Sequence, residues 1–108
     1  MDEISISEET RVVEVMGSEL RAFDFKPVKR RLGVPAGGTP EENAQLILGL
    51  LEGRVAGSAR DIVIMNAAVA LHLASGDHLS RSIEIAEESL KSGAALEKLR
   101  KLIQVYAQ

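Results

Sequence analysis

From residue 39 onward, apolar side chains recur every three or four positions, which is the spacing of one face of an α-helix. Between residues 62 and 74 the chain is apolar almost all the way round, so we expect this segment to be the most buried helix. The pattern predicts four helices, near residues 39–52, 59–75, 78–92 and 94–106.

Capping residues mark where these helices begin. Thr39 is followed by Pro40 and Glu42, which combines a cap residue, proline at the first helical position and glutamate at the third. Ser58 and Asp77 are expected to cap the second and third helices in the same way. The breaks between helices are expected at glycines, namely Gly53, Gly76 and Gly93.

The N-terminal part has the pattern of β structure, which we expect over residues 4–25. Ile4 and Ile6 alternate with serines, and two runs rich in valine and phenylalanine flank a short turn at Gly17. A two-stranded hairpin is marginally stable alone, so it must pack on the helices that follow the connector at residues 26–38. The sequence therefore predicts an α+β fold, with an N-terminal β-hairpin packed on about four α-helices in one domain, residues 1–108.

Composition narrows the class of protein. The chain has 108 residues, 45% of them apolar, which is ordinary for one globular domain. Its net charge is −3 and it has only three aromatic residues, which disfavours nucleic-acid binding. The basic run Lys29-Arg30-Arg31 keeps that alternative open, and salt-dependent binding would reveal it.

The sequence favours a soluble, cytoplasmic protein. It contains no cysteine, so disulfides and thiolate chemistry are excluded. The N-terminus is acidic, unlike that of a secretory signal, and the longest apolar stretch is too short to cross a bilayer. We therefore expect no membrane partner.

Two short motifs could bind ligands. Asp2 and Glu3 are adjacent carboxylates of the kind that bind Mg²⁺, although acids near a chain terminus are more often simply solvated. Gly37-Gly38-Thr39 precedes a helix and could hold a phosphate, but the two glutamates in the first turn would repel it. We expect this second motif to be a capping loop.

The remaining polar candidates are expected to be structural. His72 lies on the apolar helix and should be hydrogen-bonded, whereas His78 should be exposed. Arg60 and Asp61 are expected to form caps or salt bridges, and Asn66 should bond a backbone edge. No catalytic or substrate-binding residue is assigned.

Several stretches, in the right order and spacing, resemble anthranilate phosphoribosyltransferases over the entire chain: DEIS at 2–5, TRVVE at 10–14, GTPEENA at 38–44, ARDIV at 59–63, NAAVAL at 66–71 and SGAAL at 92–96. The resemblance implies an enzyme that joins anthranilate to the ribose of phosphoribosyl pyrophosphate in tryptophan biosynthesis. It also implies that Asp2 and Glu3 bind Mg²⁺, which holds the donor's pyrophosphate.

The same resemblance places the chain in the C-terminal part of the family's α/β domain. The family's glycine-rich loop, its anthranilate contacts and its dimer-forming helices lie upstream of the Asp-Glu motif. We therefore expect a fragment that is inactive alone and that associates with itself or with the missing portion. The alternative is a non-catalytic interaction module derived from the same fold.

Overall fold

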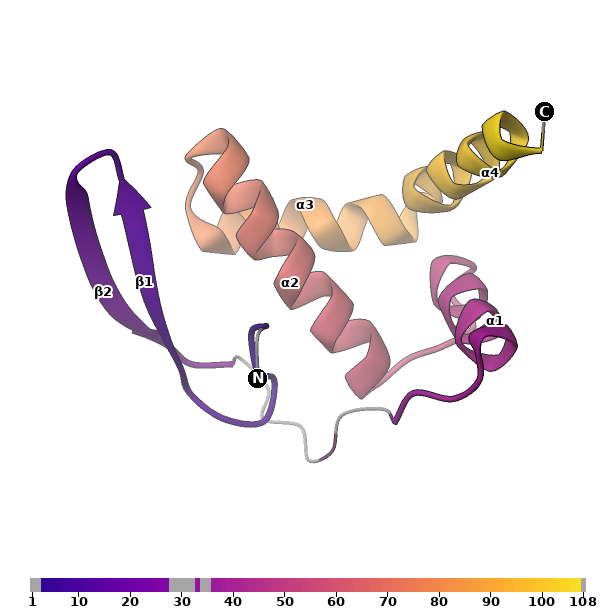
Figure 1. Cartoon of the computed structure of the whole chain (residues 1–108), viewed down its shortest axis with the longest axis horizontal. Coiled ribbons are helices and arrows are strands. Elements are labelled where there is room, and N and C mark those ends of the chain that lie inside the picture. Colours follow the sequence, from indigo (N-terminus) through magenta and orange to yellow (C-terminus); the bar gives the residue numbers. More distant parts are fainter. Residues whose placement is uncertain (1–2, 28–32, 34–35, 108) are drawn as a thin grey trace.

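A computed structural model describes residues 3–27, 33 and 36–107 of the chain (Figure 1). Within these ranges a two-stranded hairpin is followed by four helices, which confirms the α+β class. The elements are β1 (Thr10–Met16), β2 (Glu19–Phe25), α1 (Pro40–Leu51), α2 (Ser58–Ser75), α3 (Leu79–Lys91) and α4 (Ala94–Tyr106).

The hairpin forms because two β-prone runs meet across a two-residue turn. β1 and β2 are antiparallel, with Thr10 opposite Phe25 and Met16 opposite Glu19. Gly17 has a φ of 61°, a left-handed conformation that glycine adopts without a steric penalty. Alternate residues of β1, among them Val12 and Glu14, face inward and are partly buried. The hairpin was therefore predictable from its own residues.

The expected β structure does not extend to residues 4–9, and this part of the prediction is wrong. β1 begins at Thr10. Backbone amides of residues 4–9 donate to side-chain oxygens instead of to a neighbouring strand. Ser5 N–H donates to Thr10 Oγ1, and Glu8 N–H donates to Ser5 Oγ. Serine and threonine commonly compete with β ladders in this way. The alternation of isoleucine and serine reflects burial of the two isoleucines within a bent segment.

The first helix begins as predicted, and the next two begin differently. Thr39 accepts from Glu42 N–H while the Glu42 side chain accepts from Thr39 N–H, a complete capping box. The N-cap of α2 is Gly57 rather than Ser58, and that of α3 is His78 rather than Asp77. Neither residue makes a side-chain capping hydrogen bond. Asp77 lies in the tight connection after α2, where its own N–H donates to Ser75 Oγ.

The core forms on both sides of α2. One cluster joins Met65 to the buried Ile4 and Ile6 of the N-terminal segment, with Val12 and Phe25 of the hairpin packed against it. A second cluster joins Ile64 and Ala68 to α3; its other members are Ala86, Leu71, Leu79, Ile83 and Leu90. Among the described helices, α2 has the most buried residues, as predicted.

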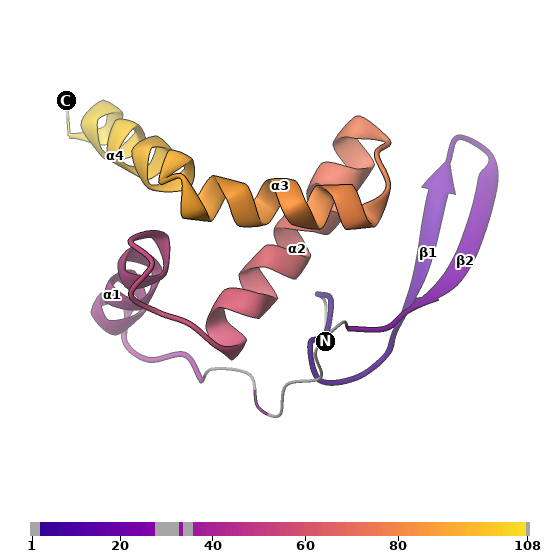
Figure 2. The same ribbon diagram turned by 180° about the vertical axis from the view of Figure 1, so that it is seen from behind.

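The other elements lie toward opposite ends of α2. The hairpin lies at one end of α2, whereas α1 and α4 lie toward the other end (Figures 1 and 2). No residue of α4 is buried, and Tyr106 near its end is 82% exposed. Part of α2 is itself uncovered, because Val63 and Leu73 are exposed. Apolar surface of both α2 and α4 is therefore open to solvent.

Candidate functional site

Glu3, the described half of the acidic pair, directly precedes the residue at which the N-terminal segment is bonded to α2. Glu3 is exposed, whereas the next residue, Ile4, is only 8% exposed and Ile6 only 1%. Asp2, the other half of the predicted metal pair, lies outside the described residues. The two buried isoleucines hold the segment against Met65, and the Glu3 carboxylate is left at the surface beside this anchor.

Asn66 of α2 clamps the backbone directly after Glu3. Ile4 N–H donates to Asn66 Oδ1 over 3.0 Å, and Asn66 Nδ2 donates back to Ile4 O over 3.4 Å. Nδ2 also donates to Ile62 O of its own helix over 2.9 Å. The prediction that Asn66 hydrogen-bonds a backbone edge is confirmed. The backbone it bonds is that of Ile4, the residue directly after the acidic pair.

The chemistry of this motif suits a hard cation. Mg²⁺ binds one or two protein carboxylates and takes its other ligands from water and substrate phosphates. The Glu3 carboxylate is exposed and directly precedes the hydrogen-bonded Ile4, so it can supply one oxygen ligand of this kind. Among the described residues, no group of three or more His, Cys, Asp or Glu side chains could hold a metal.

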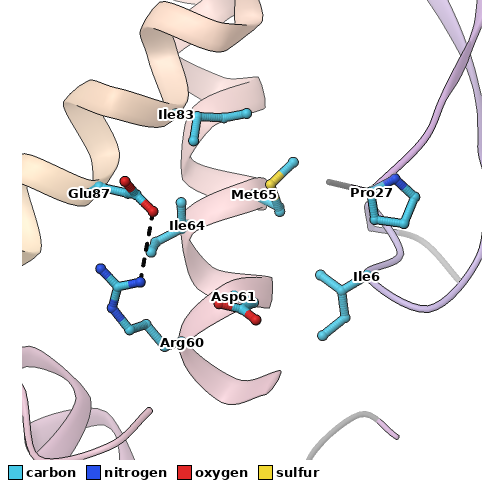
Figure 3. A pocket seen from close by; sticks show the side chains of 8 residues that line it. All are labelled: Ile6, Pro27, Arg60, Asp61, Ile64, Met65, Ile83 and Glu87. Carbon is cyan, nitrogen blue, oxygen red and sulfur yellow. Dashed lines mark ion pairs between the residues drawn. The ribbon is translucent and has the colours of Figure 1, made fainter. Parts of the chain in front are cut away.

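A pocket of about 300 Å³ lies beside the same segment (Figure 3). Ile6 and Pro27 line one side of it, and Asp61 and Met65 of α2 face them. Arg60 points the other way, toward α3, where its Nη1 is 3.8 Å from Glu87 Oε1. The expected salt bridge of Arg60 is therefore present and joins two helices.

A second pocket, of about 270 Å³, lies between the hairpin and α2. Its lining is largely apolar, except for Glu14 and His72, whose Oε1 and Nε2 atoms are 3.3 Å apart. His72 Nδ1 lies 2.6 Å from Asp77 O, and it must donate because a carbonyl can only accept. His72 is hydrogen-bonded as expected, and His78 is exposed as expected.

Two backbone amides of the loop before α1 are occupied by side chains of the helix itself. Gly38 N–H donates to Asn43 Oδ1 over 2.9 Å, and Thr39 N–H donates to Glu42 Oε2 over 2.8 Å. These are donors that a phosphate would need. The interpretation of Gly37-Gly38-Thr39 as a capping loop is confirmed. Lys29, Arg30 and Arg31 lie outside the described residues.

Two further polar residues are enclosed by the fold and were not expected from the sequence to be so. Glu14 occupies an inward position of β1, and a charged residue at such a position was the available signal that it has a partner. Ser82 of α3 is fully buried, and its Oγ has no hydrogen-bond partner among the described residues. A serine on a helix carries no comparable signal.

No helix in the described part of the chain is long and apolar enough to cross a membrane.

Comparison with known proteins shows which family the chain resembles over almost its whole length. The family described as "Glycosyl transferase family, a/b domain" matches residues 1–96. An anthranilate phosphoribosyltransferase of Haloferax volcanii is 36% identical over 104 residues, which cover 91% of this chain and 31% of the relative. Enzymes of the same name from Natronomonas pharaonis and Thermomicrobium roseum are 37% and 40% identical; each match covers 94% of this chain and 32% of the relative. The chain thus spans about a third of the length of these relatives, and the resemblance seen in the sequence is confirmed.

Proposed function

The chain belongs to the glycosyl transferase family, a/b domain, and from this membership we propose that it is the C-terminal part of an anthranilate phosphoribosyltransferase. The identity of 36–40% to relatives of that name, over almost the whole chain, carries the proposal. In the complete enzyme the substrates would be anthranilate and phosphoribosyl pyrophosphate, and the pathway tryptophan biosynthesis.

The reaction needs charge stabilisation at the leaving group. The amino nitrogen of anthranilate attacks C1 of the ribose, the bond from C1 to the pyrophosphate oxygen breaks, and pyrophosphate leaves with that electron pair. The amine then loses a proton. Bound Mg²⁺ would neutralise the charge that gathers on the pyrophosphate in the transition state.

We propose Glu3 and Asp2 as the residues that would hold this cation. The support from the structure is the anchored backbone beside an exposed Glu3 carboxylate. Ile4 and Ile6 fix the segment in the core, so the carboxylate has a defined base from which to reach outward. These residues therefore contribute placement of the ligand, and proton transfer is not assigned to any of them.

We propose that the 108-residue chain alone does not catalyse the transfer, because it spans only 31–32% of the relatives. The rest of such an enzyme would pack on the uncovered apolar surface of the hairpin and α2. Leu20 is 73% exposed and Leu73 is 65% exposed, with Val13, Val15 and Val63 also uncovered. Exposed apolar groups of this kind mark interaction surfaces. In the isolated chain, a second copy of the chain would cover this surface instead.

A chimera tests the proposal. This chain would replace the matching segment of the Thermomicrobium roseum relative, with which it is 40% identical. We expect anthranilate-dependent release of pyrophosphate from the chimera and none from the same relative lacking the segment. A folded chimera of native-like oligomeric state with no transferase activity would overturn the proposal.

A further inference from the structure

We propose that Asn66 is a positioning residue for the cation-binding carboxylate, acting through the backbone of Ile4. This inference rests on the proposed function, because it assigns a role at the same acidic motif. It adds a residue in the middle of α2, which lies 62 positions along the chain from the segment that it holds.

The geometry of the amide supports this role. Asn66 Oδ1 accepts from Ile4 N–H and Asn66 Nδ2 donates to Ile4 O, so one side chain bonds both polar groups of one residue. The Ile62 carbonyl accepts the third bond and fixes the orientation of the amide plane. Side chains with only acceptors or only donors cannot make this arrangement.

The hydrogen bonds of Asn66 affect Glu3 because they are made at the adjacent residue. Glu3 is covalently joined to Ile4, so any rotation of the Ile4 backbone redirects the Glu3 carboxylate. Ile4 is buried against Met65, the neighbour of Asn66 in α2, and this packing holds the side chain while Asn66 holds the main chain. A metal ligand in a segment without regular secondary structure otherwise loses backbone entropy when it binds. Asn66 would remove part of that loss before the cation arrives.

The first readout is the order of the backbone. In the ¹⁵N-labelled chain, Asn66→Ala should make the Ile4 amide exchange with solvent about five- to tenfold faster, because its acceptor is lost. Asn43 provides a matched control, since it makes the same two-way bond with the backbone of Gly38 at the start of α1. Asn43→Ala should leave exchange at Ile4 unchanged.

The second readout is cation affinity without catalysis. Mn²⁺ prefers the same oxygen ligands as Mg²⁺ and broadens the resonances of nearby amides. Preferential broadening at Glu3 and Ile4 should require about tenfold more Mn²⁺ in Asn66→Ala. Broadening at Glu8 and Glu9, two exposed acidic residues further along the N-terminal segment, serves as the reference. Glu3→Gln should remove the broadening at Ile4. Ile64→Val, which weakens the packing of α2 against α3 without touching the hydrogen bonds to Ile4, should leave the Mn²⁺ requirement unchanged.

The outcomes separate this inference from the proposed function. If Mn²⁺ broadens Glu3 and Ile4 equally well in Asn66→Ala and in the unchanged chain, the positioning role is wrong and the metal pair stands. If Ile64→Val weakens Mn²⁺ binding as much as Asn66→Ala does, the effect comes from general loss of stability, and the positioning role is again wrong. If Mn²⁺ causes no preferential broadening at Glu3 in the unchanged chain, the metal assignment itself fails, and the role of Asn66 fails with it.

Discussion

Glu14 of β1 and His72 of α2 face each other with 3.3 Å between Oε1 and Nε2, and this contact ties the hairpin to the central helix. The two side chains are only 11% and 24% exposed, so they lie at the edge of the apolar contact between the elements. The second nitrogen of His72 is taken by the Asp77 carbonyl, which fixes the orientation of the ring. The hairpin is therefore held in two ways. Val12 and Phe25 pack against the N-terminal core cluster, and the Glu14–His72 pair adds a polar contact with α2.

A double-mutant cycle on Glu14→Gln and His72→Gln should give a coupling free energy of about 0.5–1 kcal/mol, because the two side chains are in contact and partly shielded from water. Urea unfolding followed by circular dichroism would measure it. The Arg81 and Glu84 pair of α3 is a control, because both side chains are about two-thirds exposed and should couple by only about 0.2–0.5 kcal/mol. Equal coupling in the two pairs would contradict a tie between hairpin and helix.

Loss of the capping box should loosen α1 locally. Thr39→Ala removes the acceptor for Glu42 N–H and should destabilise the helix by about 1 kcal/mol. Hydrogen exchange over the first turn of α1 would then accelerate while exchange in α2 stays unchanged. Ser58→Ala is the matched substitution at the start of α2, where Gly57 is the cap and no side-chain cap bond exists, and it should have little effect.

Ser82 should be better replaced by alanine. Its hydroxyl is fully buried and its Oγ has no partner in the described part of the chain, so removing it relieves a desolvated polar group. Ser82→Ala should raise the free energy of unfolding by about 1 kcal/mol, and thermal and urea unfolding would show it. Ser80→Ala on the exposed side of α3 reports the gain from helix propensity alone, about 0.5 kcal/mol or less. A loss of stability in Ser82→Ala would mean that the hydroxyl makes a bond which supports the fold.

Most of the fold could be predicted because each element carries its own signal. Thr39, Pro40 and Glu42 mark one helix start, and Gly76 with a φ of 73° marks a helix end. Residues 4–9 misled the prediction because alternation reports burial, whereas the hydroxyl groups of Ser5 and Thr10 determine the backbone path.

The site could be predicted only in part. The type of bond made by Asn66 followed from a polar amide on an apolar helix, but its partner Ile4 depends on how distant segments fold together. The same is true of Glu14 and His72, which are far apart in the chain. The choice of Asp2 and Glu3 as cation ligands came from the family resemblance, because an acidic pair alone does not distinguish a site from a solvated terminus.

The isolated chain should self-associate through the uncovered surface of the hairpin and α2. Leu73→Glu places a charge in that surface and should shift sedimentation toward the monomer, because burying an unpaired carboxylate is costly. Tyr106→Glu is the control, because Tyr106 is even more exposed than Leu73 (82% against 65%) but lies at the end of α4. Its substitution should leave association unchanged. A monomeric unchanged chain at high concentration would contradict this use of the surface.

The most direct test of the central claim is the turnover number of the active chimera after Asp2→Ala and, separately, Glu3→Ala. Loss of a residue that only supports a metal ligand typically lowers metal affinity or activity by about 10–100-fold, and loss of a ligand itself should cost at least as much. Glu3 is exposed, so its substitution should leave the melting temperature nearly unchanged. The account predicts a turnover at least about tenfold lower for each variant, partly restored by excess Mg²⁺. Full turnover in both variants would contradict the assignment of this chain's acidic motif to the catalytic site of a phosphoribosyltransferase.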